Sequence, residues 1–242
     1  MPMPATAPVP IVLLAWRRPE YLAKCLNGLA HVAGIGGAVL LPHVEPGCAE
    51  SRALIEGFAA CAVRPTWNAE RLGFLANCLA GLEHGFALGD YLLFFEEDVV
   101  PAADFLEYHA WARERYRDDP GVGSVAAYHR RESACPRAEH HAVRRRPGFH
   151  GWGCGLWRDK LPVPLAGIAA GGSLDTTYDR HYRATGTVEV YPELSRVQNV
   201  GLTTTVQTDT AYDAAWYLKN HRLKHWAGQV EPLDAGEFRE VA

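Results

Sequence analysis

The sequence lacks the features that mark several large classes of protein. No apolar run approaches the ~20 residues that a membrane-spanning helix needs, so we expect no transmembrane segment. There is no excess of positive charge either, with 24 Lys+Arg against 28 Asp+Glu and a net charge of −4. A nucleic-acid partner is therefore not expected, because such proteins need a basic surface to displace counterions from phosphates. Neither a Walker loop nor a G-x-G-x-x-G fingerprint is present, so the main sequence evidence for a P-loop NTPase or a dinucleotide dehydrogenase is missing.

Paired cysteine motifs and a secretory signal are also missing. The six cysteines show no C-x-x-C spacing and no zinc pattern, and we interpret most of them as small buried hydrophobic residues in a reducing, cytoplasmic protein. The apolar run that begins at Val9 has its positive charges after it, whereas a secretory signal has them before. This run is therefore interpreted as structure, and the proline-rich residues 1–8 as a disordered N-terminus.

What is present is the composition of an ordinary globular protein. The 242 residues are 48% hydrophobic and 21% charged, and they show no internal repeat. We expect residues 9–242 to form a single domain.

Apolar runs alternate with helical periodicity along the first half of the chain. Strands are predicted at 9–15, 38–41, 63–67 and 91–95, with a helix after each of them. This β-α-β order predicts an α/β fold with a mostly parallel sheet flanked by helices.

The second half is less regular. The pattern predicts a strand at 122–127, a helix at 175–184 and a strand at 188–191. Residues 42–47, the basic stretch 128–149 and the Gly/Trp-rich stretch 150–157 are predicted to be loops. The arginines within 130–146 either close over a bound anion or form a solvated surface loop.

Three adjacent acids follow the most apolar of the predicted strands. Glu96, Glu97 and Asp98 stand between Phe95 and Val99, so they are poorly explained as a solvated charge run. Carboxylates this close repel one another unless a cation neutralises them, and a hard divalent ion, Mn²⁺ or Mg²⁺, suits oxygen ligands. The alternative is a loop whose acids cap the next helix.

Basic residues follow the other predicted strands at the same edge of the sheet. Ligands of open parallel sheets bind beyond the carboxyl ends of the strands, where Arg17, Arg18 and Arg71 would lie. A metal ion among these residues suits a diphosphate leaving group. The acceptor side needs a base: Asp175 is a candidate, with Asp179 one turn further on, and a helix-cap role for Asp175 fits the local pattern equally well.

Three segments together resemble the GT-A glycosyltransferases. They are residues 9–17 with Cys25-Leu26, residues 94–108, and the stretch Tyr191-Pro192-Glu193-Leu194-Ser195-Arg196. Within that fold the resemblance is to N-acetylglucosaminyltransferase I and its bacterial relatives, and it spans residues 9–201. It implies a nucleotide-binding half at 9–127 and an acceptor half at 128–242. The implied reaction is a metal-dependent, inverting transfer of a sugar from a nucleoside-diphosphate sugar, with a UDP-sugar favoured, to a carbohydrate or glycoconjugate acceptor.

The resemblance also implies roles for individual residues. Asp98 would hold the metal, Glu97 would face the ribose, Glu96 would lie near the donor sugar, and Asp175 lies in the region of the inverting base. The remaining implied donor-binding residues are Trp16 and Arg17 near the diphosphate (with Arg18 as the alternative to Arg17), Glu45 at the nucleoside, Asn68, Arg71 and Asn77 around the base, and Trp152 at the donor-sugar and acceptor site.

Two other functions remain open. A sugar-phosphate nucleotidyltransferase uses a similar sheet and metal, although the segment after the first strand lacks its Gly-rich loop. A non-catalytic nucleotide- or carbohydrate-binding protein on the same fold is the second. Outside these sites, His109 is interpreted as a surface or satisfied helix residue, Trp157 and Trp216-Tyr217 as packing residues, and His221 and His225 as surface histidines.

Overall fold

A computed structural model describes residues 8–129, 135–161, 173–201 and 236–241. The ten strands of the central sheet are β1 (Val9–Ala15), β2 (Ala38–Val44), β3 (Ala62–Val63), β4 (Thr66–Trp67), β5 (Tyr91–Glu96), β7 (Val122–Val125), β8 (Ala142–Pro147), β9 (Cys154–Trp157), β10 (Val188–Pro192) and β12 (Arg239–Glu240). Two further strands, β6 (Val99–Pro101) and β11 (Val197–Asn199), pair with each other. The helices are α1 (Pro19–Ala30), α2 (Ala49–Glu56), α3 (Phe74–Leu88), α4 (Phe105–Tyr116) and α5 (Leu174–Thr185), with short 3₁₀ turns at Ile35–Gly37, Arg137–Glu139 and Arg158–Lys160.

The sheet is mostly parallel, as predicted. Its order is β12-β8-β10-β7-β9-β5-β1-β2-β3, with β4 also paired to β2. Strand β1 runs parallel to β2 and β5, and β7 runs parallel to β10. Strand β9 lies antiparallel between β5 and β7, and so joins these two parallel groups into one sheet.

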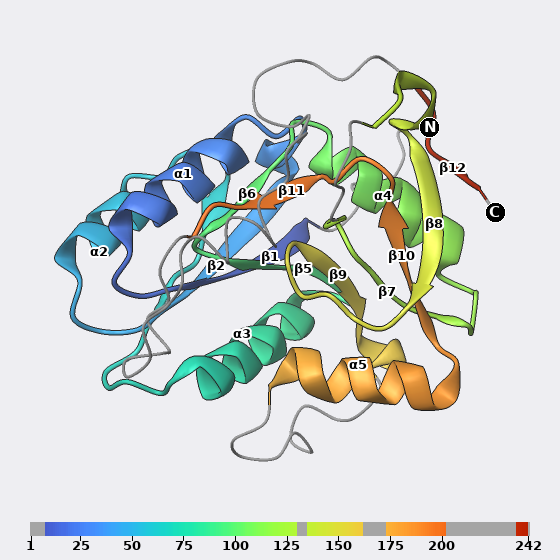
Figure 1. The fold of residues 1–242 in the computed structure, drawn as a ribbon. Helices are drawn as coiled ribbons and strands as arrows, with labels where there is room; N and C mark the ends of the chain where they lie inside the picture. The colour runs from blue at the N-terminus through green and yellow to red at the C-terminus, as the bar shows by residue number, and fades with distance from the viewer. Residues whose placement is uncertain (1–7, 130–134, 162–172, 202–235, 242) are drawn as a thin grey trace, which may run out of the picture.

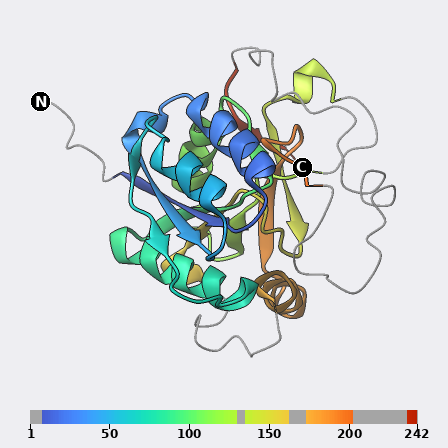
Figure 2. The ribbon, with the colours of Figure 1, turned by 90° about the vertical axis from the view of Figure 1, so that its left-hand side faces the viewer.

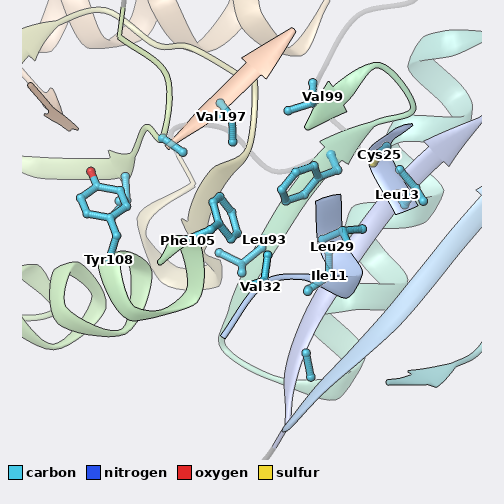
Figure 3. Close-up of a cluster of buried hydrophobic side chains, with 14 of the residues drawn as sticks. Ile11, Leu13, Cys25, Leu29, Val32, Leu93, Val99, Phe105, Tyr108 and Val197 are labelled. Atoms are coloured by element: carbon cyan, nitrogen blue, oxygen red, sulfur yellow. The ribbon is translucent and has the colours of Figure 1, made fainter. Parts of the chain in front are cut away.

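Helices cover both faces of the sheet. In Figure 1, α1, α2 and α4 lie on the upper face and α3 and α5 on the lower one, and Figure 2 shows the same division from the side. The β6–β11 ribbon lies on the upper face between α1 and α4 (Figure 1). Each face has its own hydrophobic cluster. The upper one brings Leu13 and Leu93 of the sheet against Leu29 of α1 and Phe105 of α4 (Figure 3).

The sequence explains where the two helices next to the site begin. Pro19 at the first position starts α1, since its missing N–H is not needed there. Ser173 starts α5, because its Oγ accepts a hydrogen bond from the Thr176 N–H. Gly186 then ends α5 with a φ of 74°, in the left-handed region that favours glycine.

Four details of the predicted elements are wrong. Strand β2 extends to Val44 into the predicted loop 42–47, and the predicted strand 63–67 is two separate two-residue strands. The basic stretch 128–149 contains β8, and the Gly/Trp-rich stretch contains β9.

Ion pairs explain why the sequence of β8 lacks the apolar pattern by which a strand is predicted. Its three arginines are held by acids of neighbouring segments rather than by apolar packing: Arg144 by Glu193, Arg145 by Asp119 and Glu240, and Arg146 by Glu189. These arginines therefore belong to the sheet and not to a loop over an anion. Whether residues 130–134 close over a bound anion stays a prediction, because they lie outside the described residues.

Other packing predictions have mixed outcomes. Trp157 is buried, as predicted, and His109 is a satisfied helix residue rather than a surface one. All six cysteines are free; three are buried and three are half-buried. Trp216-Tyr217, His221 and His225 lie outside the described residues. In the part of the chain that the structure describes, none of the helices has the length and hydrophobicity needed to cross a bilayer.

Candidate active site

The acidic triplet lies where β5 ends, next to the end of β1. Glu96 is the last residue of β5 and pairs with Leu14 of β1, and Glu97 and Asp98 form the turn into β6. Glu96 is half-buried, whereas Glu97 and Asp98 are only 3% and 5% exposed. Acids this deeply buried need partners, since an unpaired buried charge is costly.

The partner of Glu97 and Asp98 is Arg18, the residue that precedes α1. Its Nε donates to Glu97 Oε1 at 2.6 Å, and its Nη1 donates to Asp98 Oδ2 at 2.8 Å. One planar guanidinium therefore spans both carboxylates, a geometry that a lysine cannot reproduce.

The other two oxygens of this pair of acids also accept hydrogen bonds. Glu97 Oε2 accepts from the backbone N–H of Trp16 at 2.7 Å, and Asp98 Oδ1 accepts from Asn199 Nδ2 at 3.3 Å. Asn199 in turn accepts from the N–H of Gly201, where a Cβ would collide with Asp98. The ends of β1, β5 and β11 are thus tied together through two carboxylates.

Charge and burial shift the pKa values of these groups. Burial raises the pKa of Glu96 well above its usual range, and the charges of Asp98 and Asp175 raise it further. Burial also raises the pKa of Glu97, although the hydrogen bonds and charge of Arg18 oppose this. For Arg18, burial lowers the pKa, but the attraction of Asp98 and Glu97 outweighs burial and raises it. Arg18 is therefore permanently charged.

This arrangement does not fit a divalent ion at Asp98. Each oxygen of Glu97 and Asp98 already accepts a hydrogen bond, and the guanidinium lies where a shared cation would lie. Among the described residues, no group of three or more His, Cys, Asp or Glu side chains is arranged to hold a metal. The metal-ligand role of Asp98 stays a prediction that this geometry does not favour.

Two further guanidinium groups surround Trp16. Those of Arg71 and Arg17 lie 4.1 Å and 4.9 Å from the indole ring, and both side chains are exposed. The Trp16 indole N–H donates to the carbonyl of Pro46 at 3.0 Å, which orients the ring. Within the described ranges, no carboxylate pairs with either arginine. Trp16, Arg17 and Arg71 therefore lie together and carry positive charge near the triplet. Their contact with a donor stays a prediction.

Glu45 and its neighbours shape the adjacent loop. Both oxygens of the buried Glu45 carboxylate accept backbone hydrogen bonds, from Leu72 N at 3.0 Å and Gly73 N at 2.7 Å. Asn68 donates to Asn77, which donates to the carbonyl of His43. These side chains fix the loop that carries Arg71 and the start of α3. Their predicted contact with a nucleoside stays a prediction.

Asp175 lies in the first turn of α5, two residues after its cap. Since Ser173 is the N-cap, the helix-cap role for Asp175 is wrong. Asp175 as a whole residue is exposed, but its carboxyl group lies against Gly151. The loss of water around that group, with a contribution from the charge of Asp179, raises its pKa to about 6. No described residue forms a hydrogen bond or ion pair with the Asp175 carboxylate. Its charge contributes to the raised pKa of Glu96.

Asp179 is engaged elsewhere. Its Oδ2 accepts from Arg183 at 2.8 Å and its Oδ1 accepts from the N–H of Phe149 at 3.3 Å. The hydrogen bond from Arg183 lowers its pKa. Of the two predicted bases, Asp175 is the one whose carboxylate is not bound to another described group.

The Gly/Trp-rich segment contacts Asp175. Gly151 is buried, and a Cβ at this position would lie 2.6 Å from Asp175 Oδ1, so only glycine allows this approach. Next to it, the half-buried Trp152 packs edge-on against Tyr128 and His150, with ring centroids 4.8 Å and 4.9 Å apart. Trp152 thus lies in the loop next to the candidate base, and its predicted contact with the donor sugar or acceptor stays a prediction.

Two of the three segments that carried the resemblance meet in space. Asp104 accepts from the Nε of the fully buried Arg196 at 2.8 Å, and Ala102 N donates to the Arg196 carbonyl. This ion pair holds β6 and β11 together beneath the site, which explains why the segments 94–108 and 191–196 occur in combination.

A separate groove of about 820 Å³ lies on the opposite edge of the sheet. It is lined by the starts of β1, β2 and β5 together with α4. Ligands of parallel sheets bind at the other ends of the strands, so this groove is not the candidate site.

Sequence reasoning missed two residues of the site, Asn199 and Gly201. It named Arg18 as a basic residue near the diphosphate, and not as the partner of the acids. The contacts of Asn199 and Gly201 with Asp98 are separated by about a hundred residues along the chain, and no local spacing signals such a pair.

Comparison with known proteins supports the fold. No protein-family model matches the chain, and neither does any curated protein. Solved structures do match. The mannosyltransferase PcManGT from Pyrobaculum calidifontis, in complex with GDP-Man and Mn²⁺, is 18% identical, with a TM-score of 0.55 over 79% of this chain and 56% of that one. TarS 1-349 of S. aureus, in complex with UDP-GlcNAc, is 10% identical, with a TM-score of 0.57 over 84% of this chain and 62% of that one.

The chain has a glycosyltransferase fold. This supports the predicted GT-A architecture, whereas the finer resemblance to N-acetylglucosaminyltransferase I is not shown. The chain spans less than two thirds of the length of each of these two matched chains. At such identities the likeness concerns the glycosyltransferase fold alone.

Proposed function

We propose that the protein transfers a sugar from a nucleoside-diphosphate sugar to a hydroxyl group of an acceptor. The observation that carries this proposal is that a region of positive charge and a region with a carboxylate base both lie at the ends of the strands. One holds the guanidinium groups of Arg17, Arg18 and Arg71; the other holds the carboxylate of Asp175, to which no residue in the described ranges is bound. A diphosphate leaving group needs the first, and a hydroxyl nucleophile needs the second.

The fold neighbours support the same substrate class. The structure of PcManGT, a mannosyltransferase, contains GDP-Man and Mn²⁺, and that of TarS 1-349 contains UDP-GlcNAc. The carboxyl ends of β1 and β5, where the basic residues of this chain gather, are where an α/β sheet binds such ligands.

Asp175 is the proposed general base. The acceptor oxygen attacks the anomeric carbon while its proton passes to a carboxylate oxygen of Asp175, and the bond from that carbon to the diphosphate oxygen breaks. One displacement from the opposite face inverts the anomeric centre. A pKa of about 6 leaves Asp175 mostly ionised at neutral pH and still basic enough to take the proton.

Glu96 has a different proposed role. It is half-buried beside Asp98 and Asp175, and burial raises its pKa, so it can present a protonated carboxyl to the donor sugar. A protonated acid donates a hydrogen bond to a sugar hydroxyl without adding charge next to the diphosphate.

The test is a screen of UDP-GlcNAc and GDP-mannose. We expect one of them to raise the Tm of the protein, since a ligand that binds only the native state stabilises it. Slow release of the nucleoside diphosphate should follow, and it should speed up with the right acceptor. Release of pyrophosphate from a sugar phosphate and a nucleoside triphosphate would instead identify a nucleotidyltransferase. Donor binding with neither hydrolysis nor transfer across acceptors would identify a binding protein.

A further inference from the structure

The cation between Glu97 and Asp98 is a side chain of the protein itself. We propose that the Arg18 guanidinium takes the place of a divalent ion, so that the donor binds and reacts without metal. This rests on the proposed function, and it differs from the metal dependence that the acidic triplet suggests in the sequence.

The geometry of Arg18 is that of a bridging cation. It reaches one oxygen of each acid, Glu97 at 2.6 Å and Asp98 at 2.8 Å, from a side chain that is 13% exposed. A metal ion shared by these acids would need the same two oxygens. To bind there it would have to displace both hydrogen bonds and leave a desolvated guanidinium without these partners.

The oxygens that face away from Arg18 are engaged as well. The Trp16 N–H holds one oxygen of Glu97, and Asn199 holds one oxygen of Asp98. Gly201 packs against Asp98 so closely that no side chain fits there. The carboxylates are thus built into the join between β1, β5 and β11, with their orientation fixed by backbone and side-chain donors.

Positive charge for a diphosphate is available nearby without a metal. Arg17 and Arg71 flank Trp16, whose backbone holds Glu97, and neither pairs with a described carboxylate. Arg18 is matched by Glu97 and Asp98, whereas Arg17 and Arg71 add two exposed guanidiniums beside that cluster. Planar guanidiniums with several donors suit the oxygens of a diphosphate. We therefore expect Arg17 and Arg71 to bind the diphosphate while Arg18 neutralises Glu97 and Asp98.

Two measurements on the full chain test this. The first follows donor binding and nucleoside diphosphate release with excess EDTA or with Mn²⁺, using UDP-GlcNAc and GDP-mannose. The second titrates Mn²⁺ alone into the protein and detects free ion by electron paramagnetic resonance. We expect chelation to leave binding and release unchanged, and the wild type to take up no stoichiometric Mn²⁺.

Substitution of Arg18 sharpens the test. Arg18→Gln removes the cation and leaves two carboxylates, so we expect it to gain a Mn²⁺ site and to lose donor turnover in EDTA by roughly 10²- to 10³-fold, with partial recovery in Mn²⁺. Arg117→Gln is the matched control, because Arg117 forms an exposed ion pair with Asp159 away from the site. If Arg18→Gln does not fold, Arg18→Lys keeps one positive charge between the acids but loses the two-point contact, so it should take up no stoichiometric Mn²⁺ and turn over donor in EDTA more slowly than the wild type.

The outcomes separate the two proposals. Loss of donor binding in EDTA with recovery in Mn²⁺, or a stoichiometric Mn²⁺ site in the wild type, would overturn the role of Arg18 and leave the proposed function standing. A failure to bind either donor, with or without metal, would count against the proposed function. The Mn²⁺ titration of the wild type decides the role of Arg18 in that case too.

Discussion

Asp175 and Asp179 are one helical turn apart, yet their surroundings give them different chemistry. Asp179 is bound to Arg183 and to the backbone of Phe149, and its pKa is lowered. Asp175 has no such partner in the described part of the chain, and its pKa is raised to about 6. A base must be ionised, unpaired and not too acidic, and only Asp175 meets these conditions.

Replacing Asp175 tests this directly. We expect Asp175→Asn to lower the rate of transfer by roughly 10²- to 10⁴-fold, the usual contribution of a general base, while leaving donor binding intact. The Tm should stay the same or rise, since the variant removes a carboxylate whose ionised form the fold disfavours. Steady-state kinetics and calorimetry measure the two effects.

Asp179→Asn is the matched control for that variant. It changes the same chemical group one turn away and loses only an exposed ion pair with Arg183, so transfer should change little. An Asp179→Asn variant that is as inactive as Asp175→Asn would move the base to Asp179.

The raised pKa of Asp175 also predicts a pH dependence. Protonation removes the base, so kcat/KM should be constant above about pH 7 and fall about tenfold per pH unit below a midpoint near 6. The residual activity of Asp175→Asn should not fall in this way below pH 6. If the fall persists in that variant, another titrating group is responsible for it.

At the scale of elements, the site depends on how helix ends and loops meet the strands. The first turn of α5 carries Asp175, Ser173 caps it, and Gly151 fits against the Asp175 carboxylate. Trp16 and Arg18 come from the short connection between β1 and α1. None of these segments is long, so small local changes should alter the geometry of the site.

Gly151→Ala is the element-scale test. Its Cβ would lie 2.6 Å from Asp175 Oδ1 and push that carboxylate aside. Because small misplacements of a catalytic group cost up to roughly 10²-fold, we expect a fall in kcat of about that size with the stability little changed. Gly37→Ala, at a position where a Cβ meets nothing within 4 Å, is the control and should behave as wild type. Equal activity of the two variants would show that Gly151 does not position Asp175.

The cap of α5 gives a second prediction. Ser173→Ala removes the acceptor for the Thr176 N–H and should cost about 1 kcal/mol of stability, measured by urea unfolding. The first turn then frays, and transfer should fall along with stability. Ser173→Asp restores an acceptor, so it should recover both stability and transfer. If it recovers stability without transfer, the N-cap hydrogen bond does not position Asp175.

At the scale of the whole molecule, one antiparallel strand and one ion pair join distant parts of the chain. Strand β9 connects the β5-β1-β2 group to the β7-β10 group, and the buried Arg196–Asp104 pair joins β11 to the start of α4. The site lies on this join, since β11 also supplies Asn199 to Asp98.

Breaking that ion pair should destabilise the whole protein. Asp104→Asn leaves the fully buried Arg196 without its carboxylate, and we expect a loss of about 3–5 kcal/mol in the free energy of unfolding. The double variant with Arg196→Met should lose less than the sum of the two single losses, since both residues act through one contact. Additive losses in urea unfolding would mean that the pair does not act as a unit.

The sequence by itself determined most of the fold and the edge of the sheet where the chemistry lies. Hydrophobic periodicity is a local property, so strands β1 and β5 and helices α1, α3, α4 and α5 could be predicted, and the acids were placed at a strand end. Strand β8 could not, because its arginines are satisfied by Glu189 on β10, Glu193 just after β10, Glu240 on β12 and Asp119, which only the folded chain brings close.

Only the tertiary structure decided which group binds the carboxylates of Glu97 and Asp98. Spacing shows that Glu97 and Asp98 need a positive charge, but not whether an ion or a side chain supplies it. Arg18 comes from 79 and 80 residues earlier and Asn199 from 101 residues later than the acids that they bind. Contacts over such separations depend on how the strands are ordered, and that order is a property of the whole sheet.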